Sequence, residues 1–157
     1  AKYRKGHFEG VIDIIDRFLS IIKPKYMFLG KKDFQQLFLI KKYIPKKYYI
    51  KIIPCLTIRD RKKLAFSSRN KLLSKNQLIK ARKISNEIFL LKKSLYKSRN
   101  AKKLISNKKK ELVNSFNIKF DYLELRNISN LKVSNKVKNS KLFFAYYING
   151  IRLIDNH

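Results

Sequence analysis

A net charge of +29 is carried by only 157 residues, yet 45% of these residues are hydrophobic and 13% are aromatic. This apolar share is enough for a packed core, which excludes a disordered polycation. The length suits one domain of ordinary size, or one and a half small ones. No apolar run approaches the ~20 residues of a transmembrane helix, and the first residues lack the apolar core of a signal peptide. We therefore expect a soluble, cytoplasmic protein without a membrane partner.

The first part of the chain alternates helical and strand-like patterns. Apolar residues at helical spacing predict a helix over 11–22, and a continuous apolar run predicts a strand over 26–29 that is buried on both faces. Asp33 is predicted to cap a helix that runs to about residue 43, and a second strand is predicted over 48–58. This order forms a βαβ unit with parallel strands. A doubly wound sheet needs more strands, so either the sheet is small or part of it lies outside this chain.

Two residues of the second predicted strand carry expectations of their own. Pro54 has no N–H to donate, so it must lie on an edge strand or at a bulge. Cys55 is the only cysteine, so it cannot form an internal disulfide, and its apolar surroundings predict a buried side chain.

After residue 70 the pattern becomes that of a small α+β unit. Ser74-Lys75-Asn76-Gln77 is a capping box that predicts the start of a long helix, and a weaker helix is predicted over about 100–116. Runs of β-branched and aromatic residues separated by turn residues predict strands over 119–126, 141–148 and 151–154. We expect a boundary between a first domain, 1–72, and a second domain, 73–157.

Two clusters of groups that can bind phosphate each follow a strand-like run. One contains a glycine, two lysines and a carboxylate over 30–33, with Gln36 one turn later; the other contains two serines and an arginine over 67–69. Ligands of open α/β sheets bind at the carboxyl ends of strands, where helix N-termini favour phosphate. The clusters together predict a nucleotide site assembled from neighbouring loops, in which the two serines and the arginine suit a triphosphate.

The remaining candidate groups are less specific. His7 could face a ligand, but a lone histidine at a helix start is more often a cap or a core residue. His157 is terminal in the sequence, which predicts a disordered side chain. No Cys/His cluster has metal-ligand spacing, and neither a P-loop nor a dinucleotide-binding fingerprint is present.

The high charge leaves an alternative open, a basic nucleic-acid-binding module on an α/β scaffold. Lysine is spread through every segment and outnumbers arginine, whereas bidentate phosphate or base recognition favours arginine. Lys, Ile, Asn, Tyr and Phe share AT-rich codons, so a biased genome could produce this composition without a polyanionic partner. We therefore favour the hypothesis of a basic surface that is merely solvated over the hypothesis of a nucleic-acid-binding surface.

Five segments resemble the pantothenate synthetase (pantoate–β-alanine ligase) family in matching order and spacing: 6–11, 30–37, 64–70, 121–126 and 152–156. The resemblance covers nearly the whole chain and corresponds to the C-terminal part of that enzyme. It implies that 1–72 is the end of a Rossmann-like, nucleotidyltransferase-like domain and that 73–157 is a small α+β lid domain. The family's N-terminal half, with its His-x-x-His-type motif and catalytic proton donor, has no counterpart here, so we expect little turnover by this chain alone.

The resemblance implies an ATP-dependent ligase that uses Mg²⁺ and is typically a cytoplasmic homodimer. In its first step the carboxylate of pantoate attacks the α-phosphate of ATP, which gives pantoyl adenylate and pyrophosphate. The amine of β-alanine then attacks the adenylate and yields pantothenate and AMP.

The resemblance also implies residue roles. Lys32 and Arg69 would stabilise charge on the phosphates, Gln36 would hold pantoate, and Ile58 would meet the base through its backbone; no metal ligand is implied. The full ATP-binding set on matching positions is Gly30, Lys31, Lys32, Asp33, Ile58, Phe66, Ser67, Ser68 and Arg69. The chain departs from the family at Lys5, where proline is usual, at Lys31, where glutamate is usual, and at Lys63, where glycine is usual. A lysine at position 31 predicts a contact through the backbone only.

Overall fold

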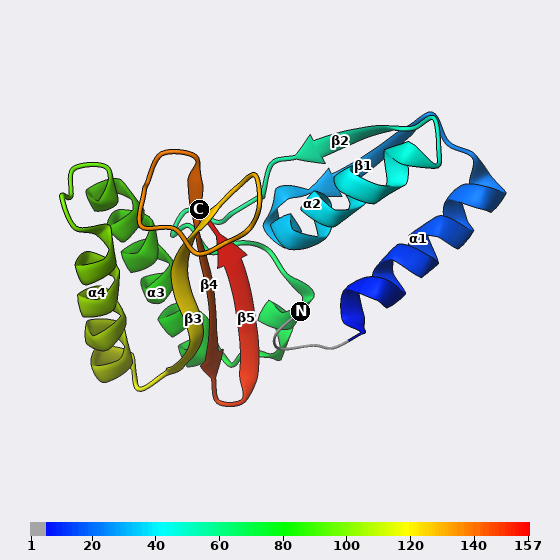
Figure 1. Cartoon of the computed structure of the whole chain (residues 1–157). Helices are drawn as coiled ribbons and strands as arrows, with labels where there is room; N and C mark the ends of the chain where they lie inside the picture. Colours follow the sequence, from blue (N-terminus) through cyan, green and yellow to red (C-terminus); the bar gives the residue numbers. More distant parts are fainter. Residues whose placement is uncertain (1–5) are drawn as a thin grey trace. The chain divides into compact units, whose positions relative to one another are not determined.

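The structure, a computed structural model, describes residues 6–157, and its contacts divide the chain into two compact units, Ala1–Thr57 and Ile58–His157 (Figure 1). Lys5 therefore lies outside the described residues. Residues 58–72, which the sequence analysis grouped with the first domain, make their contacts within the second unit. Within the described residues, no helix has both the length and the apolar character needed to cross a membrane.

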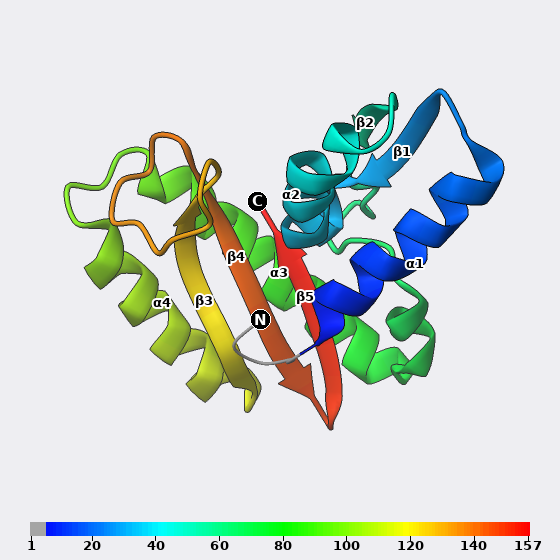
Figure 2. The same ribbon diagram turned by 45° about the vertical axis from the view of Figure 1, so that its right-hand side comes forward.

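The first unit is a βαβ arrangement preceded by a helix, as predicted (Figure 2). Its two strands pair in parallel, with Tyr26 opposite Lys51 and Gly30 opposite Cys55. The apolar side chains of Leu19, Ile40, Ile44 and Ile50 form its core. The elements are α1 (His7–Ile22), β1 (Tyr26–Gly30), α2 (Phe34–Tyr43) and β2 (Lys51–Cys55), with 3₁₀ turns η1 (Lys31–Asp33) and η2 (Ile44–Lys46).

Burial in this two-stranded sheet differs from the prediction. Met27 and Leu29 pack against the core of the unit, but Tyr26 and Phe28, which alternate with them, are 55% and 67% exposed. The prediction that β1 is buried on both faces is therefore wrong, because the helices of the unit cover only one face. Cys55, at the end of β2, is also exposed rather than buried. Pro54 lies on β2, which pairs only with β1 among the described strands, and this confirms its edge position.

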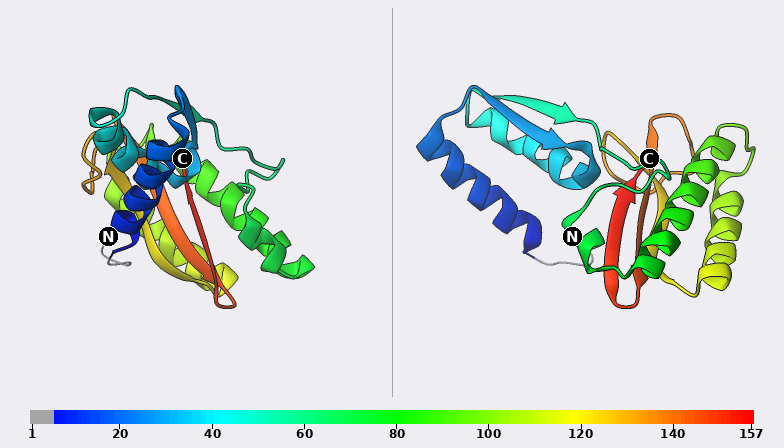
Figure 3. Two further views of the ribbon diagram at one scale, coloured as in Figure 1. Left: turned by 90° about the vertical axis from the view of Figure 1, so that its right-hand side faces the viewer. Right: turned by 180° about the vertical axis from the view of Figure 1, so that it is seen from behind.

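The second unit is a three-stranded antiparallel sheet with the order β3-β4-β5 and two helices on one face (Figures 1 and 3). This confirms the predicted fold class, a parallel α/β arrangement followed by an α+β arrangement. Large apolar side chains from both helices and all three strands form one core, including Ile84, Ile88, Leu112 and Phe144. The elements are η3 (Ser68–Leu72), α3 (Lys75–Leu95), α4 (Ala101–Phe116), β3 (Lys119–Asn127), β4 (Ser140–Ile148) and β5 (Ile151–Asn156).

Local signals explain where the helices of this unit begin. The predicted capping box is present: the Gln77 N–H donates to Ser74 Oγ at 3.3 Å, and the Ser74 N–H donates to Gln77 Oε1 at 2.9 Å. At the start of α4, the Asn100 side chain accepts a hydrogen bond from the Lys103 N–H at 3.0 Å.

His157 is buried and paired with a neighbouring strand, so the prediction that this terminal residue is disordered is wrong. Its N–H and C=O both pair with Leu142 at 2.9 Å, which extends the pairing of β5 with β4 by one residue. The imidazole lies against Phe89 and Phe144, with ring centroids 5.7 and 5.6 Å away. Burial, together with the positive charges of Arg59, Lys92 and Lys141, lowers the pKa of His157 from 6.5 to about 3.

Candidate functional site

The first predicted cluster lies at the carboxyl end of β1. Because Gly30 pairs with Cys55, the residues that follow β1 and those that follow β2 leave the same edge of the sheet. Gly30 has φ −68° and ψ 133°, an extended conformation open to any residue, so the turn itself does not require glycine. A Cβ at this position would meet no atom within 4 Å, which leaves room for another molecule above the backbone.

The residues after Gly30 form the 3₁₀ turn η1 and lead into α2. Lys31 and Lys32 are half-buried in this turn, whereas Asp33 is exposed. Asp33 stands at the N-cap position of α2, but its side chain makes no capping hydrogen bond, so that part of the prediction is wrong. The positive end of the α2 dipole is thus not occupied by the Asp33 carboxylate and can attract another anion. Gln36 is half-buried in the first turn of α2.

The second predicted cluster begins with a short hairpin over residues 58–66. The Phe66 N–H donates to the Ile58 carbonyl at 3.1 Å, and the Asp60 N–H donates to the Leu64 carbonyl at 2.9 Å. Ile58 and Phe66 therefore lie opposite each other at the open end of the hairpin. Their side chains are 74% and 62% exposed, which gives an apolar pair on the surface of this unit.

The polar residues after Phe66 are held in place by local hydrogen bonds. Ser67 is the N-cap of η3, and its Oγ accepts from the Arg69 N–H at 3.3 Å, whereas Ser68 is exposed. The Arg69 guanidinium donates to the Arg152 carbonyl on β5 at 3.3 Å. Asn70 Nδ2 donates to the Ala65 carbonyl at 3.0 Å, which ties η3 back to the hairpin.

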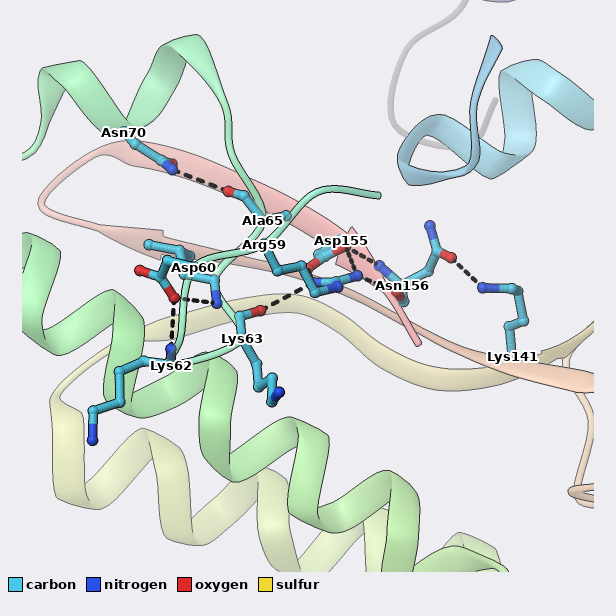
Figure 4. A network of polar contacts seen from close by, with 10 residues as sticks. Arg59, Asp60, Lys62, Lys63, Ala65, Asn70, Lys141, Asp155 and Asn156 are labelled. Atoms are coloured by element: carbon cyan, nitrogen blue, oxygen red, sulfur yellow. Dashed lines mark hydrogen bonds and ion pairs between the residues drawn. The ribbon is translucent and has the colours of Figure 1, made fainter. Parts of the chain in front are cut away.

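A polar network missed by the sequence analysis fixes the hairpin to the rest of its unit (Figure 4). The Arg59 guanidinium forms a two-pronged ion pair with the Asp155 carboxylate at the end of β5 and also donates to the Asn156 carbonyl at 2.9 Å. Asp60 accepts from Arg82 Nε on α3 at 2.7 Å. The sequence offered only weak signals for this pair. Arg59 follows Ile58, and Asp155 lies in one of the segments that resemble the family, but neither position shows that the two residues contact each other.

The site residues thus fall into two groups, each assembled within its own unit. The first unit brings together Gly30, Lys31, Lys32, Asp33 and Gln36, and the second brings together Ile58, Phe66, Ser67, Ser68 and Arg69. In the second group the pairing of Ile58 with Phe66 places the predicted base contact beside the predicted phosphate contacts. The roles assigned to these residues remain predictions.

The comparisons with known proteins identify the family. The family model described as pantoate-beta-alanine ligase matches residues 1–157. The chain belongs to the pantoate–β-alanine ligase family. It is 35% identical over 160 residues to the pantothenate synthetase of Flavobacterium psychrophilum, covering 99% of this chain and 56% of that protein. It is 43% identical over 156 residues to a bifunctional pantoate ligase/cytidylate kinase of Prochlorococcus marinus, covering 98% of this chain and 30% of that protein.

Solved structures of pantoate–β-alanine ligases agree with the fold. The Thermus thermophilus pantothenate synthetase aligns with a TM-score of 0.89 at 24% identity, covering 99% of this chain and 57% of that one. The Francisella tularensis pantoate-beta-alanine ligase, described as complexed with beta-gamma ATP and beta-alanine, aligns with a TM-score of 0.71 at 32% identity, covering 99% and 52%. The chain spans about half the length of the curated pantothenate synthetases that it matches.

Proposed function

We propose that this chain is the C-terminal, ATP-binding part of a pantoate–β-alanine ligase that forms pantothenate through a pantoyl adenylate, with release of pyrophosphate and AMP. The observation that carries the proposal is the match of residues 1–157 to the family, together with phosphate-seeking clusters assembled in both units. The Francisella tularensis ligase, 32% identical to this chain, is described as bound to beta-gamma ATP and beta-alanine, which supports these substrates.

The residues of the first unit would bind phosphate and pantoate. The dipole of α2 and the Lys32 ammonium favour negative charge at the end of β1. Lys31, half-buried in η1, would contribute its backbone N–H, while Gly30 and Asp33 line the same turn. The Gln36 amide can donate to the carboxylate or hydroxyl of pantoate.

The residues of the second unit would bind the base and the phosphates. The Ile58 carbonyl accepts from the Phe66 N–H, which fixes the backbone of Ile58 that would contact the base. Phe66 offers an apolar face, Ser67 and Ser68 offer hydroxyl groups, and Arg69 offers a planar guanidinium suited to phosphate oxygens. Lys32 and Arg69 would lower the barrier to adenylation by stabilising the charge that develops on the phosphates.

Magnesium would arrive with the nucleotide rather than in a protein-made centre. Among the described residues, no group of three or more His, Cys, Asp or Glu side chains is placed to hold a metal ion. In this proposal the ligands of Mg²⁺ would be mainly ATP phosphates and water. We further propose that the first unit belongs to a Rossmann-like domain and that the enzyme acts as a cytoplasmic homodimer.

The test measures ATP binding by the chain in calorimetry and compares Lys32→Ala and Arg69→Ala with the wild type. Loss of one charged phosphate contact should weaken ATP binding by about 10- to 100-fold. Lys41→Ala and Arg99→Ala remove the same charges from exposed positions in the same two units and should leave the affinity within about twofold.

Activity is tested with the chain joined behind the N-terminal part of the Flavobacterium psychrophilum relative. Formation of AMP and pantothenate from ATP, pantoate and β-alanine is expected, and it should drop in the Lys32 and Arg69 variants. Absence of activity together with unchanged ATP binding in both variants would refute the proposal. Normal turnover by the 157 residues alone would refute the expectation that the chain is only part of the active enzyme.

A further inference from the structure

We propose that the ion pair between Arg59 and Asp155 positions the 58–66 hairpin, and through it the residues that bind ATP. Arg59 and Asp155 are positioning residues in this proposal and do not touch the nucleotide. The proposal rests on the function proposed above for Ile58 and for residues 66–69, but its structural part can be tested without ATP.

The Arg59 guanidinium donates four hydrogen bonds to three residues. Its Nη2 donates to Asp155 Oδ1 at 2.9 Å and to the Asn156 carbonyl at 2.9 Å, and its Nη1 donates to Asp155 Oδ2. Nη1 also donates to the carbonyl of Lys63 at 3.1 Å, across the turn of its own hairpin. One guanidinium therefore joins both ends of the hairpin turn to the last residues of β5.

The carboxylate partner is fixed from its own side. The Asp155 side chain is 5% exposed, and its Oδ1 also accepts from the Asn156 N–H at 2.8 Å. Asn156 in turn accepts a hydrogen bond from Lys141 Nζ on β4 at 2.7 Å. A bidentate pair held this way has a defined direction, which a single ammonium contact would not give.

Asp60 provides a second, weaker anchor on the other side of the same turn. Its Oδ1 accepts from the N–H groups of Lys62 and Leu64 at 2.9 and 3.1 Å, and its Oδ2 accepts from Arg82 Nε at 2.7 Å. These bonds shape the turn and link it to α3, but the Arg82 side chain is 41% exposed, so this pair is more easily disrupted by water.

Apolar packing does little to hold the open end of the hairpin. Leu64 and Ala65 are buried, but Ile58 and Phe66, the residues proposed to meet the nucleotide, are mostly exposed. The position of these two side chains and of η3 therefore depends on the polar anchors. Arg69 donates to the Arg152 carbonyl and Arg59 donates to the Asp155 carboxylate, so both ends of this segment are bonded to the same strand, β5.

The first experiment measures hydrogen exchange of the backbone amides in the full 157-residue chain without ligand. In Asp155→Asn, which keeps the shape of the side chain but removes its charge, amides of residues 64–70 should exchange about tenfold faster than in the wild type. Amides in the middle of α3 and β4 should be unchanged. Arg59→Lys keeps the charge but not the fork, and we expect an intermediate increase over the same residues.

A matched control removes a similar ion pair elsewhere in the unit. Arg126 and Glu124 on β3 form a half-buried pair, with side chains 25% and 24% exposed, and Glu124→Gln should leave the exchange of residues 64–70 at the wild-type rate. The proposal is overturned if residues 64–70 keep wild-type exchange in Asp155→Asn. It is equally overturned if both Asp155→Asn and Arg59→Lys accelerate all amides of the unit alike, since the pair would then support the whole fold.

The second experiment measures ATP affinity in the same proteins. The positioning role is supported if the variants show faster exchange of residues 64–70 and unchanged exchange in β4, and if they bind ATP about tenfold more weakly than the wild type. Faster exchange with wild-type ATP affinity overturns it. If the wild-type chain joined to the relative's N-terminal part binds no ATP, the proposed function fails, while faster exchange of 64–70 in the variants still supports the anchoring of the hairpin.

Discussion

Acid should destabilise the second unit through His157, and replacing this histidine by phenylalanine should remove the effect. The imidazole is buried against two aromatic rings, and its Nε2 has no hydrogen-bond partner among the described residues. Protonation would place a charge in this apolar site beside Arg59, Lys92 and Lys141, which lower its pKa. His157→Phe keeps an aromatic ring of similar shape and has no proton to gain.

The size of the effect follows from the two pKa values. The folded pKa is about 3 and the unfolded value is 6.5, so between these values the unfolded chain binds more protons. Stability therefore falls as the pH drops below 6.5 and stops falling below the folded pKa. Between pH 7 and pH 5 this single group should cost the wild type about 2 kcal/mol of unfolding free energy.

The assay is urea unfolding at pH 7, 6 and 5, followed by circular dichroism because the chain contains no tryptophan. At pH 7 the phenylalanine variant should be at least as stable as the wild type, since it buries no unpaired nitrogen. At pH 5 its advantage over the wild type should be about 2 kcal/mol larger than at pH 7, because every other titrating group is common to both proteins. An equal difference in stability at pH 7 and pH 5 would refute the argument that His157 is neutral and buried.

Four further outcomes are expected. Ile88→Ala, at a fully buried core position, should lower the unfolding free energy by about 2–5 kcal/mol in urea titrations. The exposed Cys55 thiol should react with a disulfide reagent as fast in the folded chain as in urea. Lys63→Gly should be more stable than Lys63→Ala by about 1 kcal/mol, because φ is +67° at this residue. Duplex DNA should bind only weakly in ~150 mM salt; tight binding would favour the nucleic-acid alternative.

Local signals were sufficient for most of the second unit. The capping box at Ser74 predicted the start of α3, and runs of β-branched and aromatic residues between turn residues predicted three strands, because short-range hydrogen bonds and local residue preferences decide these features. Burial in the first unit was not predictable in the same way. The apolar run of β1 is typical of a strand covered on both faces, but Phe28 is exposed because coverage depends on neighbouring elements rather than on the run itself.

The candidate site shows the same division between local and distant information. The clusters at 30–33 and 67–69 could be found from the sequence because each is contiguous and follows a strand-like run. The partner of Arg59 could not be found, because Asp155 lies 96 residues later and the pair exists only when β5 lies beside the hairpin. His157 was misjudged for a related reason: its position in the sequence says nothing of its pairing with Leu142.

The turn of the 58–66 hairpin carries backbone strain at Lys63. The chain has only 4 glycines, and six other described residues take positive φ. Three of these are asparagines, which tolerate the left-handed region, but Lys63 is not suited to it and carries a cost of roughly 1–2 kcal/mol. The turn must nevertheless keep this conformation, because the Lys63 carbonyl accepts from Arg59. A lysine in the left-handed region thus strains the turn, and the proposed anchoring by Arg59 and Asp60 would offset that strain.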